Sequence, residues 1–179
     1  MKKINWNNVQ EATTFERPGP GGYICGILGA EDIPDKEYIA CQYDIIEGDF
    51  KNYYRDRTTR NPDWDLPVFR KSYKEKALGF FKRFLTAVQN SNPGYTFKND
   101  ERTLRGKKIG LVFGEEEYRR NDGEIGIRLV VTDFVSVDDI KNGKFKVQKR
   151  KPLKETTMDI TPPAVDYEEI TDDEEDLPF

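Results

Sequence analysis

Apolar and polar residues alternate in short runs over most of the first 150 positions, with Gly, Pro and Asn between the runs. Two runs rich in β-branched and aromatic residues, 23–30 and 38–46, predict strands. Gly26 and Gly29 predict that the first of these strands is bent or bulged. Residues 50–57 predict a third strand, which an irregular segment follows.

Helical spacing replaces this alternation after residue 72. Ser72-Tyr73-Lys74-Glu75 fits a capping box, with Ser72 as N-cap and Glu75 three residues later. The apolar stripe that follows is Tyr73, Ala77, Phe80, Phe81, Phe84, Leu85 and Val88. The spacing predicts one amphipathic helix that ends at residues 91–94, with its three phenylalanines in the core.

Alternation returns after residue 104. Apolar residues at 109–113 and 125–131 predict two strands, and Asn121-Asp122-Gly123 predicts a hairpin turn between them. Residues 134–137 extend the second strand, and residues 144–147 predict a short edge strand. The order of elements predicts a mainly β, OB-fold-like, five-stranded, partly open barrel with a helix between strands 3 and 4.

The pattern is lost near residue 152. Residues 152–179 contain four prolines, no glycine and many acids, which predicts a disordered acidic tail. We therefore expect one domain over residues 1–151 and a tail over 152–179.

Charge divides the chain in the same place. Residues 1–154 carry all 29 Lys and Arg and 23 of the 33 Asp and Glu, a net charge of +6. Residues 155–179 carry the other ten acids and no base, a net charge of −10. A basic body with an acidic tail indicates a nucleic-acid partner.

Cysteine and histidine content narrows the possible chemistry. The two cysteines, Cys25 and Cys41, lie in strand-like runs and are expected to be reduced core thiols of a cytosolic protein. Without a histidine or a CxxC pair, neither a zinc site nor a histidine base is expected. We expect no cofactor, no metal and no enzymatic activity. No apolar run is long enough to span a membrane, so we expect a cytoplasmic location.

Single-strand binding needs cations for phosphates and aromatic faces for bases. The best such stretch contains Tyr53, Tyr54, Arg55, Arg57, Arg60 and Trp64. The next best are Lys107 with Lys108 and Tyr118 with Arg119 and Arg120, at the ends of the predicted strands. Core packing is the alternative for each aromatic residue, and an exposed charged hairpin is the alternative for Tyr118–Arg120.

The C-terminal tip is an acidic run that ends in Asp176-Leu177-Pro178-Phe179. Phe179 can fill a pocket, Pro178 restricts the unbound peptide, and the terminal carboxylate can pair with an arginine. This tip resembles that of bacterial single-stranded DNA-binding proteins. The resemblance implies that Asp176, Leu177, Pro178 and Phe179 dock onto replication, recombination or repair proteins.

The body is similar to the single-stranded DNA-binding proteins that phages and mobile elements encode. The similar stretches are Gly22-Tyr23, Ala30-Glu31, Asp44–Gly48, Leu104–Lys108 and Gly110–Val112. The resemblance implies an OB-fold and, for a phage protein, the cytoplasm of a bacterial host.

The expected function is therefore to bind and protect single-stranded DNA without strong sequence preference, with a homo-oligomer possible. Two alternatives stay open. One is a DNA-mimic module that acts through its acidic tail. The other is a metal-dependent nuclease that uses Glu115–Glu117 or Asp138-Asp139.

Overall fold

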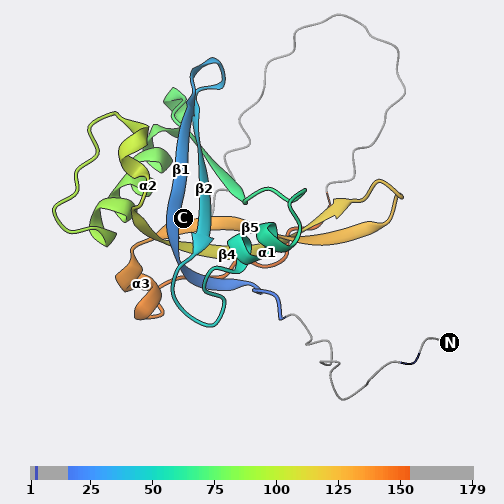
Figure 1. Ribbon diagram of the computed structural model, residues 1–179. Helices are drawn as coiled ribbons and strands as arrows, with labels where there is room; N and C mark the ends of the chain where they lie inside the picture. Colours follow the sequence, from blue (N-terminus) through green and yellow to red (C-terminus); the bar gives the residue numbers. More distant parts are fainter. Residues whose placement is uncertain (1–2, 4–15, 154–179) are drawn as a thin grey trace, which may run out of the picture.

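The computed structural model describes Lys3 and residues 16–153, which form a mainly β fold (Figure 1). Five antiparallel strands make one sheet in the order β3-β2-β1-β4-β5. The strands are β1 Gly21–Ile33, β2 Tyr38–Ile45, β3 Val68–Ser72, β4 Lys108–Arg119 and β5 Ile125–Val135. The helices are α1 Tyr53–Arg60, α2 Leu78–Ser91 and α3 Val137–Lys141, with short 3-10 helices at Pro34–Lys36, Glu75–Ala77 and Glu101–Leu104. The predicted acidic tail and its docking tip lie outside the described residues, apart from 152 and 153.

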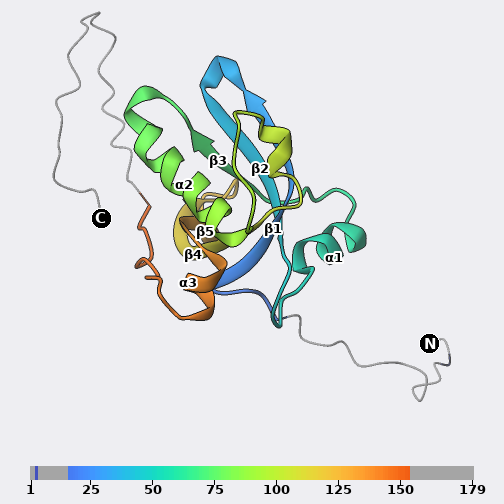
Figure 2. The same ribbon diagram turned by 90° about the vertical axis from the view of Figure 1, so that its left-hand side faces the viewer.

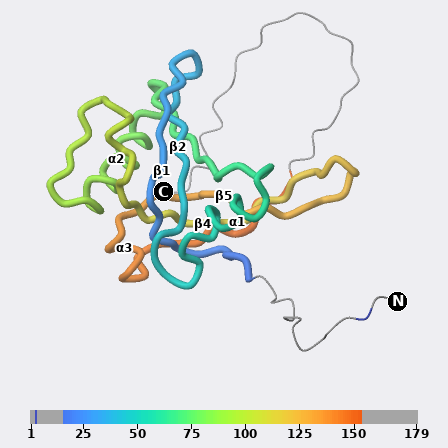
Figure 3. Tube along the Cα trace, viewed as in Figure 1, coloured from blue at the N-terminus to red at the C-terminus, as the bar shows by residue number. Residues whose placement is uncertain are grey.

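The long strand β1 joins the two halves of the sheet. Its first residues pair with β4, and its residues from Cys25 onward pair with β2. The register with β2 shifts between Ile27 and Gly29, which confirms the predicted bulge. The β1–β2 hairpin consequently crosses the β4–β5 hairpin steeply, as Figures 1 and 3 show.

Two glycines let α3 and the chain after it lie directly on the sheet. A Cβ at Gly22 would stand 2.6 Å from the Phe145 ring, and one at Gly110 would stand 2.5 Å from Ile140. Both distances are too short for any larger residue without a shift of the neighbours. The chain then returns along β4, where Lys151 exchanges backbone hydrogen bonds with Glu115 and Glu117.

The sheet is not closed, and β3 and β5 are its edge strands. Side chains nevertheless connect these edges. The rings of Phe69 in β3 and Phe134 in β5 are 5.0 Å apart, and Lys71 Nζ lies 4.3 Å from the centre of the Phe134 ring. Phe84 of α2 contacts both rings, so α2, which follows β3 as predicted, packs against both edges.

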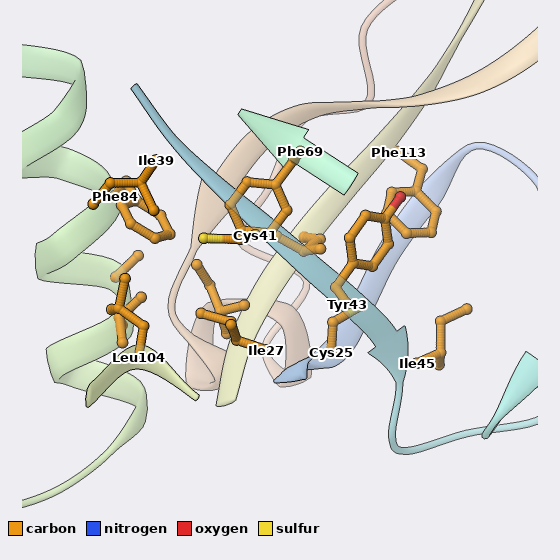
Figure 4. Close-up of a cluster of buried hydrophobic side chains, with 14 of the residues drawn as sticks. Cys25, Ile27, Ile39, Cys41, Tyr43, Ile45, Phe69, Phe84, Leu104 and Phe113 are labelled. Carbon is orange, nitrogen blue, oxygen red and sulfur yellow. The ribbon is translucent and has the colours of Figure 1, made fainter. Parts of the chain in front are cut away.

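The buried side chains extend from α2, where Phe84 lies, across the strands to Tyr43, Phe113 and Ile45 (Figure 4). Ile27, Cys41, Phe84, Leu104 and Phe113 are among the fully buried ones. Cys25 and Cys41 are both free and buried, as predicted, and burial raises the pKa of Cys41 to about 12. Both thiols are therefore protonated at neutral pH.

Residues 50–57 do not form the predicted third strand. They form a loop and the start of α1, and the third strand is Val68–Ser72. The cause is Asp44, whose buried carboxylate accepts hydrogen bonds from the backbone N–H groups of Tyr54 and Arg55. These donors are left open at a helix start, so a carboxylate there stabilises the helix.

The predicted helix begins later than its sequence pattern indicates. Ser72 is the last residue of β3, and α2 starts at Leu78, so the capping box at Ser72 is wrong. The hydroxyl of Ser72 accepts a hydrogen bond from the Lys74 N–H within a turn instead. Phe84 is buried as predicted and Phe81 is partly buried, but Phe80 is 50% exposed.

The end of the domain also differs from the prediction. Strand β5 stops at Val135, and the next residues form α3, whose N-cap Ser136 makes a true capping box with Asp139. Residues 144–147 form no strand, and the only pairing in this part of the described chain is the bridge between Lys151 and Glu116. The predicted hairpin turn at residues 121–123 is confirmed, with Gly123 in the left-handed region at a φ of 88°.

Candidate nucleic-acid interface

A cleft of about 810 Å³ opens beside α1, next to the unpaired edge of β5. We call it the Arg-Trp cleft. Its lining is Arg17, Pro18, Tyr43, Tyr53, Tyr54, Arg57, Arg60, Asn61, Trp64, Pro67, Glu115, Ile127, Arg128 and Leu129. These residues come from the chain before β1, from β2, from α1 and the segment after it, and from β4 and β5.

Four arginines make the Arg-Trp cleft electropositive. They are Arg17, Arg57, Arg60 and Arg128. The one acid in the lining, Glu115, is paired with Arg150 at 2.8 Å, and Arg128 is paired with Glu116. The cleft therefore carries more positive than negative charge, which favours an anionic ligand.

Trp64 provides an open aromatic surface in this cleft. Its side chain is 50% exposed, and the guanidinium carbon of Arg57 lies 4.7 Å from the centre of its ring. The same carbon lies 5.3 Å from the centre of the Tyr54 ring. Arg57 therefore holds the indole in place from within the cleft, while half of the Trp64 side chain remains accessible.

Tyr54 belongs to the core instead. Only 7% of it is exposed, and its ring packs edge-on against Tyr43 and Tyr53 at 5.6 and 5.1 Å. Burial raises the pKa of both Tyr43 and Tyr54, so these hydroxyls stay protonated at neutral pH. Tyr54 thus supports the floor of the cleft and offers no open face for stacking.

Strand β5 adds apolar side chains to the lining beside Arg128. Ile127 and Leu129 line the cleft, and the next residue on the same face of this strand, Ile125, is 57% exposed. Ile127 is itself 48% exposed. Apolar side chains that remain exposed at the edge of a basic cleft are suited to contact the faces of bases.

Arg55, a predicted contact residue, has a different position. Its Nε donates to the carboxylate of Asp44 at 2.9 Å, and its Nη2 donates to Asn52 at 2.7 Å. Arg55 does not line the Arg-Trp cleft. It holds the first turn of α1 to the end of β2, while Arg57 and Arg60 of the same helix reach the cleft. Figure 2 shows α1 on the side of the molecule away from α2.

Lys107 and Lys108 line a separate hollow of about 520 Å³, together with Tyr95 and the loop after α2. We call it the Lys107 hollow. Lys107 Nζ lies 4.5 Å from the centre of the Tyr95 ring, and Lys108 Nζ binds Glu47 at 3.0 Å. These two predicted residues therefore lie together, but apart from Trp64.

Tyr118, Arg119 and Arg120 lie at the tip of the β4–β5 hairpin. Arg119 donates to the carbonyl of Gly123 at 3.3 Å, and Arg120 is 3.8 Å from Glu124. The guanidinium of Arg128, which lines the cleft, lies 5.5 Å from the Tyr118 ring centre. The hairpin tip thus continues the rim of the cleft without forming its lining.

Sequence reasoning missed Arg17 and Arg128. Arg17 follows a polar segment, and Arg128 is one polar position in an alternating strand. Neither residue is next to the aromatic cluster in sequence, and only the fold brings them to Trp64. One sequence signal could have identified Arg128, because it stands in a predicted strand between the apolar residues Ile127 and Leu129.

The described residues hold no cluster of three or more Cys, Asp and Glu side chains placed to bind a metal ion. In the same part of the chain, no helix has the length and hydropathy required to cross a membrane. Comparisons with protein-family models and with curated proteins find no match to the chain.

Proposed function

We propose that the chain binds single-stranded DNA, and that the Arg-Trp cleft is its binding surface. One observation carries this proposal: four arginines and a half-exposed tryptophan meet in one cleft. Arginines neutralise phosphates, and an aromatic face stacks on a base. In a duplex the bases are already stacked and paired, so the Trp64 face favours an unpaired strand.

The strand arrangement supports an OB-fold-like barrel. Five antiparallel strands with a helix between the third and fourth are the parts of that fold, and the contacts of Phe69 and Lys71 with Phe134 bring its open edges together. OB-folds bind oligonucleotides across strands 2 and 3 and at the loop between strands 4 and 5. The Arg-Trp cleft takes Tyr43 from β2 and adjoins the β4–β5 hairpin.

The proposal includes a second activity, the recruitment of DNA-maintenance proteins by the C-terminal tip. Asp176-Leu177-Pro178-Phe179 combines an acidic approach with a terminal ring and carboxylate. Such a peptide suits a basic pocket with an apolar floor. The two activities use separate parts of the chain and can be tested separately.

Fluorescence titration with labelled oligothymidylate at several salt concentrations tests DNA binding. We expect log affinity to fall linearly with log salt, because each neutralised phosphate releases counterions. A matched duplex should bind more weakly. No binding to the single strand, or a salt slope near zero, would contradict the assignment of the cleft.

A pull-down with bacterial host extract tests recruitment. Deletion of residues 155–179 changes the net charge from −4 to +6 and should abolish recovery of partners, with single-strand affinity equal or higher. Phe179→Ala should lose the same partners without changing DNA affinity, because it removes the ring and no charge. Equal recovery with all three proteins would leave the tail as solubilising charge only.

A further inference from the structure

We propose that Arg57 forms a dedicated phosphate subsite in the Arg-Trp cleft, which binds one phosphodiester of the strand next to the base stacked on Trp64. This inference rests on the proposed function and adds a position-specific contact to it. Among the cleft arginines, Arg57 is distinguished by burial, by its ring contacts and by an unused donor.

The unused donor is the Nε of Arg57. This atom is buried and has no hydrogen-bond acceptor among the described residues. A buried donor without an acceptor is unusual in a folded protein, because its hydration is lost without replacement. A ligand oxygen would restore the missing hydrogen bond once the side chains that cover Nε shift to admit it.

The surroundings of Arg57 indicate which chemical group supplies that acceptor oxygen. Within residues 16–153 no acid forms an ion pair with its guanidinium, in contrast to Arg128 and Arg55. The contacts with the Trp64 and Tyr54 rings fix the position of the group and occupy none of its N–H donors. A positioned, unpaired guanidinium fits a phosphate, which offers two oxygens in the matching geometry.

The phosphate subsite lies next to the Trp64 ring on which a base would stack. The Arg57 guanidinium carbon is 4.7 Å from the centre of the Trp64 ring, so an anion on Arg57 lies beside the indole. A base on the open part of Trp64 and its neighbouring phosphate can then bind together. Arg60, one helical turn further along α1, also lines the cleft and extends the cationic surface beyond this subsite.

The test uses the full chain and the shortest oligothymidylate that retains full affinity, so that the strand cannot shift its register. Each phosphodiester in turn is replaced by a neutral methylphosphonate. For the wild type we expect one linkage whose neutralisation lowers affinity about tenfold or more, and smaller effects elsewhere. In Arg57→Gln that linkage should become no more sensitive than the others.

Arg70→Gln is the matched control. Arg70 is exposed on β3 and lies outside the cleft lining, so this variant loses the same charge without touching the subsite. It should keep the wild-type profile of linkages. Thermal unfolding of each variant identifies any loss of folded protein. Arg57→Lys keeps the positive charge but not the planar set of donors, so it should lose most of the position-specific effect.

Three outcomes would overturn the phosphate subsite. In the first, all linkages are equally sensitive in the wild type, although the natural oligonucleotide binds; the proposed function then stands without this contact. In the second, the sensitive linkage persists in Arg57→Gln. In the third, a synthetic peptide of residues 172–179 binds the wild type but not Arg57→Gln, with DNA affinity unchanged, which would assign Arg57 to carboxylates. Failure of the wild type to bind the natural oligonucleotide would instead contradict the proposed function.

Discussion

The Arg-Trp cleft and the Lys107 hollow contain the same kinds of side chain, but their cations are engaged to different degrees. In the hollow, Lys108 is bound to Glu47 and Lys107 lies over Tyr95. In the cleft, Arg57 lies over Trp64 and has a buried donor without an acceptor among the described residues. Basic and aromatic residues in a sequence therefore do not identify a binding site by themselves. The difference lies in Lys108, which the fold has already paired with an acid, and Arg57, which it has not.

An acid outside the lining acts on each region, Asp44 on the cleft and Glu47 on the hollow, and the two acids differ in burial. Asp44 is fully buried and accepts from two backbone N–H groups of α1, from that of Ile45 and from Arg55. Glu47, three residues later, is only partly buried and accepts from Lys108. Asp44 thus acts on the cleft indirectly, as a positioning residue for the helix that carries Arg57, whereas Glu47 acts on a single surface lysine.

The largest expected effect is that of Asp44→Ala. The substitution leaves buried donors at the start of α1 without an acceptor and should lower the free energy of unfolding by about 3 kcal/mol. Urea unfolding of the variant measures this loss. In the folded fraction, oligonucleotide affinity should fall as well, because α1 no longer holds Arg57 in place.

Glu47→Gln is the control for Asp44→Ala. Glu47 lies three residues after Asp44, in the connection between β2 and α1, and its exposed ion pair contributes about 0–1 kcal/mol. A stability loss as large as that of the Asp44 variant would show that the loop, rather than the helix start, is sensitive. Unchanged stability in Asp44→Ala would contradict the role given to the buried carboxylate.

The second effect separates two aromatic residues of the cleft. Trp64→Ala should weaken single-strand binding by about 1–3 kcal/mol, the contribution of one base stack, with little loss of stability. Tyr54→Ala should instead lower the free energy of unfolding by about 3 kcal/mol, because its ring is buried against Tyr43. Thermal unfolding and anisotropy titration of both variants give the four values needed.

Phe80→Ala controls for the removal of an exposed ring. Phe80 has the same exposed fraction as Trp64, but it lies on α2 and does not line the cleft. Its removal should leave oligonucleotide affinity unchanged. A loss of affinity equal to that of Trp64→Ala would move the binding surface towards α2.

The sequence predicted those strands that a local pattern of alternating apolar and polar residues marks. Residues 23–30 and 38–46 alternate and contain β-branched residues, and Asn121-Asp122-Gly123 is a strong local turn signal; all three are confirmed. Residues 50–57 were predicted wrongly because Phe and Tyr favour strands, whereas the helix that begins there depends on Asp44, which lies in another element. Long-range contacts of this kind leave no local trace in the sequence.

The candidate site was predictable to the same extent. Trp64, Arg57 and Arg60 line the cleft and are neighbours in sequence, so their composition was sufficient to nominate them. Arg17 and Arg128 come from distant segments and were missed. Arg55 has the same composition signal as Arg57 but lies two positions away on α1, where it meets Asp44 rather than the cleft. Residues two positions apart share one face of a strand but point in different directions on a helix. The predicted strand therefore placed Arg55 and Arg57 together, whereas α1 separates them.

The smallest expected effect concerns the Lys107 hollow. We predict that the bound strand also reaches Lys108. Glu47 then competes with phosphates for this lysine, so Glu47→Gln should raise oligonucleotide affinity about twofold at low salt. The hydrogen bond from Lys108 lowers the pKa of Glu47 below its ordinary 4.5. The competition is therefore complete above pH 4.5 and is lost as the pH falls through the lowered pKa of Glu47. The affinity ratio of variant to wild type should accordingly fall towards one on acidification, which anisotropy titrations at pH 7 and pH 3.5 can measure. The ratio cancels the titration of the other acids, since both proteins share them.

Lys108→Gln is the control. In a Lys108→Gln background, Glu47→Gln should no longer change oligonucleotide affinity at pH 7. Weaker binding by Glu47→Gln would contradict this competition. It would mean that the ion pair with Glu47 positions Lys108 for the strand, as Asp44 positions the helix that carries Arg57.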